Sequence, residues 1–174
     1  MNSSINDTKP QHASSRLETR EVTFANEVLL PEIVRMMDEG HTVTLRLRGN
    51  SMRPFLEDNR DKALMRKAEP EDVVVGAPVL AETANHHYVL HRIVKIEGDM
   101  VTLRGDGNIG VEMCRRSDVK GAITGFYRKG RNSLDRTDSR KWRLYSAVWC
   151  GLLPLRRYLL AFYRRIWIPL FGAV

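Results

Sequence analysis

Short segments of strand length, separated by turn signals, fill residues 42–127 and limit this chain to a few kinds of fold. The first shows the pattern most clearly, because Val43, Leu45 and Leu47 alternate with polar residues until Gly49. A period of two is typical of a half-buried β-strand. Further strands are expected at residues 62–66, 78–82, 88–96, 100–104 and 121–127. Short strands at this spacing predict a mainly β, antiparallel domain.

A single helix is expected before this domain. Between residues 25 and 39, the apolar residues Leu30, Ile33, Val34 and Met37 recur at helical spacing, and Gly40 closes the segment. Such spacing places them on one face, which predicts an amphipathic helix packed on the sheet.

The charge of the chain is concentrated near its end. Residues 128–174 hold 11 Lys and Arg against 2 acidic residues, whereas residues 1–127 have a net charge of −2. The overall composition, with 43% hydrophobic and 28% charged residues, is close to the average of globular proteins and excludes a polytopic membrane protein. A basic segment of this kind can meet nucleic acid phosphates or an anionic membrane surface.

The apolar residues of the basic segment favour the membrane surface. They recur at steps of three and four: Leu144, Val148, Leu152, Leu155, Leu159, Phe162 and Ile166. Arg157 and Arg164 lie off this stripe, and the longest uncharged run has 12 residues, short of the roughly 20 that a spanning helix needs. We therefore expect residues 142–174 to form a helix that lies on a membrane surface, interrupted at Pro154, and we expect no nucleic acid partner. The alternative is that this helix packs on its own domain or on a partner chain.

These patterns divide the chain into three parts. Residues 1–22 are expected to be a disordered lead-in without a secretory signal, residues 23–130 a β domain, and residues 131–174 a basic amphipathic helical tail. The expected location is the cytoplasm or the cytoplasmic face of the membrane. Cys114 and Cys150 have no CxxC companion, so neither a disulfide framework nor a zinc site is expected.

Ser51 is the candidate nucleophile. It follows the first strand in the turn Gly49-Asn50-Ser51-Met52-Arg53-Pro54. A serine hydroxyl needs a base to take its proton, and a backbone N–H can then stabilise the oxyanion. Taken alone, a serine in a turn is more commonly a hydrogen-bonding turn residue.

His91 is the candidate base, and two acids could orient it. On a strand, His91 shares a face with Val89 and Ile93, so its ring is expected to point toward apolar side chains. A carboxylate beside the ring would fix its tautomer and stabilise the imidazolium. Asp106, in the turn at residues 105–108, and Glu112 both remain candidates for this carboxylate.

Together these segments resemble a clan of serine peptidases that contains signal peptidase I and the self-cleaving SOS-type repressors. The resemblance is carried by four segments in the same order: Gly49-Asn50-Ser51-Met52-Arg53-Pro54, residues 61–66, Leu90-His91-Arg92-Ile93-Val94 and Gly105-Asp106-Gly107-Asn108. It implies an antiparallel β domain of the signal-peptidase/SOS-repressor type, with one preceding helix and the amphipathic tail. No cofactor is expected.

The residue at the position of the base narrows the resemblance to one branch of the clan. Bacterial signal peptidases and the repressors have a lysine where this chain has His91, whereas the endoplasmic-reticulum and archaeal signal peptidases have a histidine. In that branch acids follow the base, and the matching residues here are Asp106 and Glu112. Histidine is largely neutral near pH 7, so a histidine base is chemically coherent. A typical signal peptidase has a transmembrane anchor before its serine segment, and none is expected here.

The sequence thus predicts a serine endopeptidase that cleaves signal-like or leader-like peptides, with a peptide or preprotein as partner. The main alternative is a non-catalytic module of the same fold that binds a peptide or a partner. A metal site formed by His86, His87, His91 and Asp106 is a third and weaker hypothesis, because only His87 and His91 share a strand face.

Overall fold

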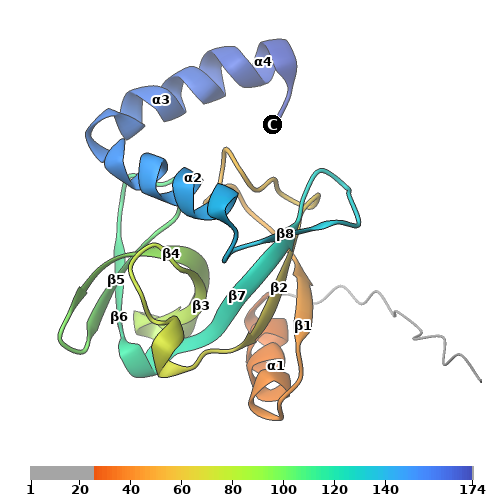
Figure 1. Cartoon of the computed structure of the whole chain (residues 1–174), viewed down its shortest axis with the longest axis vertical. Coiled ribbons are helices and arrows are strands. Elements are labelled where there is room, and N and C mark those ends of the chain that lie inside the picture. Colours follow the sequence, from red (N-terminus) through yellow and green to blue (C-terminus); the bar gives the residue numbers. More distant parts are fainter. Residues whose placement is uncertain (1–25, 174) are drawn as a thin grey trace, which may run out of the picture.

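A computed structural model describes residues 26–173, so the predicted lead-in at residues 1–22 lies outside the described part of the chain. Helix α1 (Asn26–Asp38) precedes a sheet of eight strands (Figure 1). The strands are β1 (Val43–Arg46), β2 (Lys62–Lys67), β3 (Pro78–Thr83), β4 (His87–Glu97), β5 (Met100–Arg104), β6 (Glu112–Arg115), β7 (Val119–Tyr127) and β8 (Leu134–Arg136).

All strand pairs are antiparallel, and the sheet curves into a half-barrel. Its order is β1-β2-β7-β3-β4-β5-β6, with β8 added to β7. The mainly β, antiparallel prediction is therefore confirmed. Strands β6 and β8 were not predicted, because they have only four and three residues and no period-two alternation. Since β8 lies at residues 134–136, the region 131–174 is not helical throughout.

Apolar side chains form two clusters, one toward each end of the sheet. In the larger cluster, α1 contributes Leu30, Ile33 and Met37, which pack on residues of β2 and β7. The smaller cluster is centred on Ile93, Val101 and other residues of β3, β4 and β5. The predicted helix and its buried face are confirmed.

Two helices follow the sheet, and the predicted break at Pro154 separates them. Helix α2 (Arg140–Gly151) is capped at its start by Ser139, whose hydroxyl accepts a hydrogen bond from the Trp142 N–H at 3.2 Å. A second helical stretch joins a 3-10 turn (Leu153–Leu155), α3 (Arg156–Phe162), a π turn (Tyr163–Trp167) and α4 (Ile168–Phe171). Within residues 26–173, no helix is both long and apolar enough to cross a membrane.

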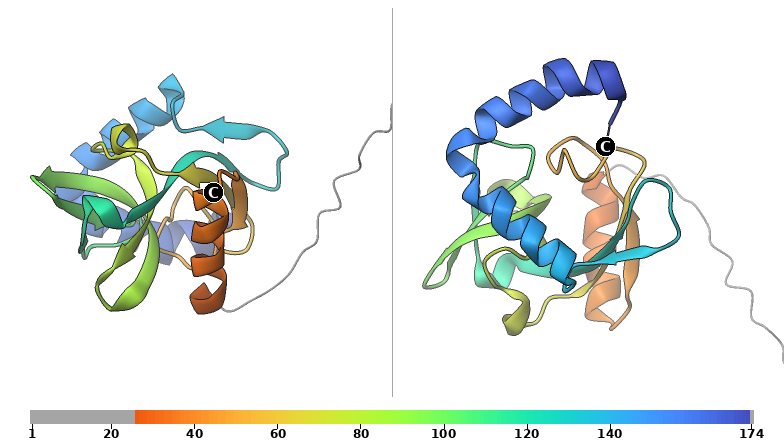
Figure 2. Two further views of the ribbon diagram at one scale, coloured as in Figure 1. Left: turned by 90° about the horizontal axis from the view of Figure 1, so that it is seen from below. Right: turned by 45° about the horizontal axis from the view of Figure 1, so that its top comes forward.

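The C-terminal helical stretch packs on the domain with a face that was not predicted. Figure 2 shows it passing along one side of the molecule beyond α2. Its buried residues are Arg156, Leu160 and Tyr163. In contrast, six of the seven residues of the predicted stripe are exposed: Leu144, Val148, Leu155, Leu159, Phe162 and Ile166. The tail thus packs on its own domain, but through another face than the predicted stripe.

Candidate active site

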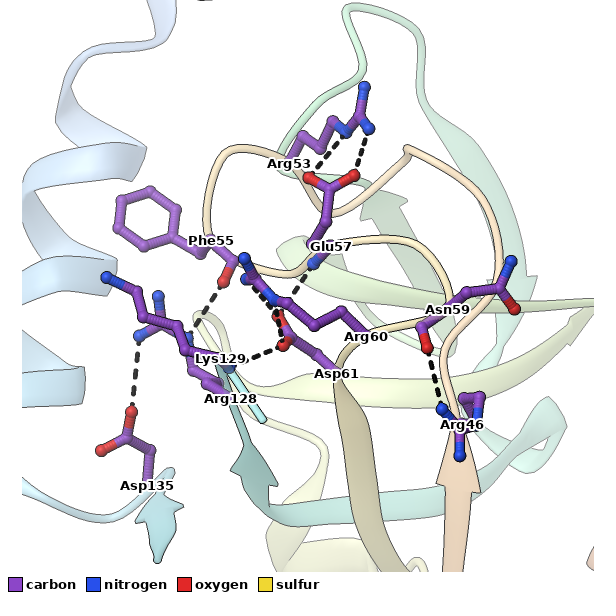
Figure 3. A network of polar contacts seen from close by, with 10 residues as sticks. All are labelled: Arg46, Arg53, Phe55, Glu57, Asn59, Arg60, Asp61, Arg128, Lys129 and Asp135. Atoms are coloured by element: carbon purple, nitrogen blue, oxygen red, sulfur yellow. Dashed lines mark hydrogen bonds and ion pairs between the residues drawn. The ribbon is translucent and has the colours of Figure 1, made fainter. Parts of the chain in front are cut away.

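Ser51 lies in the loop between β1 and β2, and this loop is fixed by a buried carboxylate. Asp61, which is fully buried, accepts hydrogen bonds from the backbone N–H groups of Glu57 and Lys129, each at 2.9 Å (Figure 3). Its carboxylate also accepts hydrogen bonds from Arg60 Nε at 2.8 Å and from Arg60 Nη2 at 2.9 Å. Burial alone would raise the pKa of Asp61, but these donors hold the pKa below its ordinary value, so the carboxylate is charged.

Further contacts fix the loop at three points along its length. Arg53 pairs with Glu57 within the loop, and Arg128, from the segment after β7, donates to the Phe55 carbonyl oxygen at 3.0 Å (Figure 3). Arg46 at the end of β1 donates to the Asn59 carbonyl oxygen at 2.9 Å. The loop that presents Ser51 is therefore attached to both its own strand and the neighbouring β7 region.

His91 lies on β4 and is buried, as its shared face with Ile93 predicted. Its Nδ1 lies 2.5 Å from Glu112 Oε2, at the start of β6. Burial lowers the pKa of His91 below its ordinary value, although the nearby charge and hydrogen bond of Glu112 act in the opposite direction. The imidazole is therefore neutral at pH 7, with Nδ1 donating to Glu112 and Nε2 as the acceptor.

Ser51 and His91 meet in one cleft. A Cβ built on Gly105 would lie 2.4 Å from the Ser51 carbonyl oxygen and 3.0 Å from His91 Nε2, so the two residues are spatial neighbours although 40 positions apart in sequence. A cleft of about 290 Å³ is lined by Ser51, His91, Glu112 and Asn108, together with apolar residues of β4 and the serine loop. Within residues 26–173, neither the Ser51 hydroxyl nor His91 Nε2 is hydrogen-bonded, either to the other or to a further group.

Two glycines let the loop after β5 close onto the serine turn. The Gly107 N–H donates to the Ser51 carbonyl oxygen at 2.7 Å. A Cβ at Gly107 would come within 2.6 Å of the Asn50 carbonyl oxygen, and one at Gly105 would collide with the Ser51 carbonyl oxygen. Any larger residue at these positions would therefore push the loop away from Ser51.

Asp106 does not take the position beside His91 for which the triad hypothesis made it a candidate. Its carboxylate is buried and accepts hydrogen bonds from Arg92 Nε at 3.0 Å and from Arg92 Nη2 at 2.7 Å. The two side chains therefore form a bidentate ion pair. The Tyr145 hydroxyl donates to the same carboxylate at 3.1 Å, and burial together with Asp106 raises the pKa of Tyr145. Glu112 is therefore the acid that contacts His91, whereas Asp106 forms a buried ion pair beneath the cleft.

Backbone groups beside the cleft are unpaired. Strand β4 pairs with β3 over residues 87–92 and with β5 only from Arg92 onward. Strand β1 pairs with β2 alone. Among residues 26–173, one backbone edge of β1 and one edge of residues 87–91 therefore carry no strand partner, and both edges lead toward Ser51 or His91.

Among the residues that the structure describes, neither a metal-ligand group nor a reactive cysteine lies at this cleft. Residues 26–173 contain no group of three or more His, Cys, Asp or Glu side chains arranged to hold a metal ion, so the hypothesis of a site at His86, His87, His91 and Asp106 is wrong. His86 pairs with Glu82, away from the cleft, and Asp106 is engaged by Arg92. Cys114 and Cys150 are unbonded to each other, and burial raises the pKa of Cys114 to about 11, so its thiol stays protonated.

Sequence reasoning missed three residues that hold the site together. Asp61 anchors the serine loop, Arg92 pairs with Asp106, and Tyr145 reaches that pair from α2. Arg92 gave one signal, since it is a charged residue in the middle of the apolar run from Val89 to Val94. Tyr145 gave no such signal, because no local sequence pattern connects α2 with the turn at Asp106, which lies 39 positions earlier.

Comparison of the chain with models of protein families, with curated proteins and with solved structures finds no match.

Proposed function

We propose that the protein is a serine endopeptidase in which Ser51 is the nucleophile, His91 the general base and Glu112 the acid that orients His91. The observation that carries this proposal is the convergence of the three residues in one cleft, with Glu112 bound to Nδ1 and the opposite nitrogen, Nε2, next to the serine turn. The likeness of four sequence segments to the signal-peptidase/SOS-repressor clan supports the same fold type and the same reaction.

Each step of the reaction has a residue suited to it. Ser51 Oγ attacks the carbonyl carbon of the scissile bond while His91 Nε2 takes the hydroxyl proton. Glu112 keeps Nδ1 protonated and stabilises the imidazolium that forms. His91 then gives its proton to the leaving amine, and a water molecule, deprotonated by His91, hydrolyses the acyl-enzyme ester.

The oxyanion of the tetrahedral intermediate needs a preorganised donor. The Ser51 N–H, on the same residue as the attacking hydroxyl, is one candidate donor, and within residues 26–173 no acceptor occupies it. The Asn108 side chain, which also lines the cleft, can supply a second donor. The serine turn is held by the loop contacts described above, so the Ser51 N–H needs little reorganisation during the reaction.

The substrate that fits this cleft best is an extended peptide. A strand inserted between the free edge of β1 and the free edge of residues 87–91 would find backbone donors and acceptors on both sides. Apolar side chains from both walls, including Leu47, Leu56 and Leu90, line the cleft and favour small or apolar side chains of the peptide. This chemistry suits signal-like or leader-like peptides.

The alternative function is a module that binds such a peptide without cleaving it. The free strand edges favour this alternative as much as they favour a peptidase, because strand addition requires no nucleophile. The pair formed by Glu112 and His91 argues for catalysis, since a binding groove has no need of an oriented, neutral histidine.

The experiment compares protein N-termini by mass spectrometry in cells that express the wild type, Ser51→Ala or Ser117→Ala. Ser117 is an exposed serine in a turn away from the cleft, so Ser117→Ala is the matched control. We expect new N-termini in the wild type and in Ser117→Ala that are absent in Ser51→Ala. Identical N-termini in all three, with Ser51→Ala fully functional in the cell, would establish the binding module instead.

A further inference from the structure

The C-terminal helical stretch carries an apolar face that the domain leaves uncovered. This apolar stripe consists of Leu155, Leu159, Phe162, Ile166, Leu170 and Phe171. Each of its side chains is more than a third exposed, and the rings of Trp167 and Phe171 contact each other at 4.8 Å between centroids. An exposed apolar surface of this extent is typical of an interaction site.

The fold itself does not provide a cover for the stripe. The helical stretch packs on the domain through Arg156, Leu160 and Tyr163, which lie on a different face from the stripe. Arg156 Nη2 donates to the Trp149 carbonyl oxygen at 2.9 Å, and its guanidinium lies 5.1 Å from the centroid of the Trp149 ring. These contacts fix the rotation of the helix and leave the stripe, on the adjacent face, more than a third exposed.

The charge around the stripe indicates what covers it. From Arg140 to the end of the sequence there are seven Lys and Arg and no Asp or Glu. Lys141 and Arg143 on α2, and Arg157 and Arg165 on the helical stretch, are exposed. A second copy of the chain would bring this cationic region against itself, whereas an anionic lipid surface attracts the cations and accepts the apolar side chains.

We propose that the C-terminal helical stretch docks the protein on the surface of an anionic membrane, with the apolar stripe inserted at the level of the lipid headgroups. Amphipathic helices bind in this way when buried apolar area and attraction to anionic lipids act together. The exposed basic residues of this region attract the headgroups, each contributing about 1 kcal/mol near the surface.

Docking in this orientation brings the catalytic cleft to the membrane. Arg164 Nη2 donates to the Gly107 carbonyl oxygen at 2.8 Å, so the helical stretch touches the loop that packs on the serine turn. A cavity of about 540 Å³ between this loop and the helix is lined by Asn108 and Glu112, which also line the cleft. The cleft thus lies beside the helical stretch that docks on the lipid surface. If the proposed peptidase activity holds, its substrates are peptides held at the membrane.

The test is flotation of the full chain with vesicles of phosphatidylcholine that contain phosphatidylglycerol, against pure phosphatidylcholine, at low and high salt. We expect binding to the anionic vesicles to be at least about tenfold stronger at low salt, and to weaken as salt is added. Phe162→Glu and Leu159→Glu should each lower it at least about tenfold, because a charge then occupies the inserted face. Met36→Glu on α1 makes the same change of charge at another exposed apolar residue and should retain binding.

Three results would overturn the proposal. One is the absence of binding to anionic vesicles. Another is an equal loss in Phe162→Glu and Met36→Glu, which would show that net charge alone drives binding. The third is concentration-dependent self-association that Phe162→Glu abolishes, which would identify a second copy as the cover. Because all substituted positions are exposed, circular dichroism should show unchanged folding. Vesicle binding is measured without turnover, so failure here is distinct from failure of the peptidase proposal.

Discussion

Two carboxylates that stand six positions apart, Asp106 and Glu112, have opposite tasks in this molecule. Asp106 is buried against Arg92, a permanent cation that it contacts at 2.7 Å. Glu112 is 41% exposed and contacts His91, whose charge can change during a reaction. The comparison teaches that a carboxylate's role follows from its partner and burial, even where two acids lie six positions apart and were both candidates for the same role.

Removing the cation of the structural pair should produce the largest effect. Arg92→Met leaves the Asp106 carboxylate buried without its bidentate partner, and it also removes the hydrogen bonds to the Gly76 carbonyl oxygen and to Ser146. We expect the free energy of unfolding to fall by about 3–5 kcal/mol, measured by urea denaturation. The double variant Arg92→Met/Asp106→Leu should recover part of this loss, because no buried charge then remains unpaired. A loss below about 1 kcal/mol in Arg92→Met would mean that the pair does not hold the loop.

Changing the acid of the other pair should affect turnover rather than stability. Glu112→Gln keeps the size of the side chain but removes the charge that stabilises the imidazolium, so kcat/KM should fall about 100-fold or more on a peptide that the wild type cleaves. The free energy of unfolding should change by less than about 1 kcal/mol, because the side chain is partly exposed. Glu97→Gln, at an exposed glutamate paired with Lys95, is the matched control and should leave both quantities unchanged. Wild-type kcat/KM in Glu112→Gln would remove this residue from the proposed mechanism.

The sequence predicted the regular parts of the fold and the members of the cleft, but it could not choose between the two acids. Period-two segments such as 43–47 report the buried face of a strand directly, and His91 was correctly placed on an apolar face by the same reasoning. The distinction between Asp106 and Glu112 depends on Arg92 and Tyr145, whose positions follow from tertiary packing. Tertiary packing also limited the prediction for the C-terminal helices. Helical spacing identified an apolar face, but it could not show that a different face would pack on the domain.

The smallest expected effect concerns the titration of His91, and it tests whether Glu112 acts on this ring. Burial lowers the pKa of His91 below its ordinary value of 6.5, so folding favours the neutral ring. The resulting contribution to stability is present above pH 6.5 and is lost as the pH falls through the lower pKa of the folded state.

We expect nuclear magnetic resonance titration, with the signal assigned through His91→Gln, to give a pKa of His91 below 6.5 in the wild type. Glu112→Gln should lower this pKa further, because the attraction of the carboxylate for the imidazolium is lost. His87→Gln, at an exposed position on the same strand, should leave the His91 curve unchanged. A His91 pKa at or above 6.5 in the wild type, or a rise in Glu112→Gln, would contradict the description of His91 as a neutral base held by Glu112.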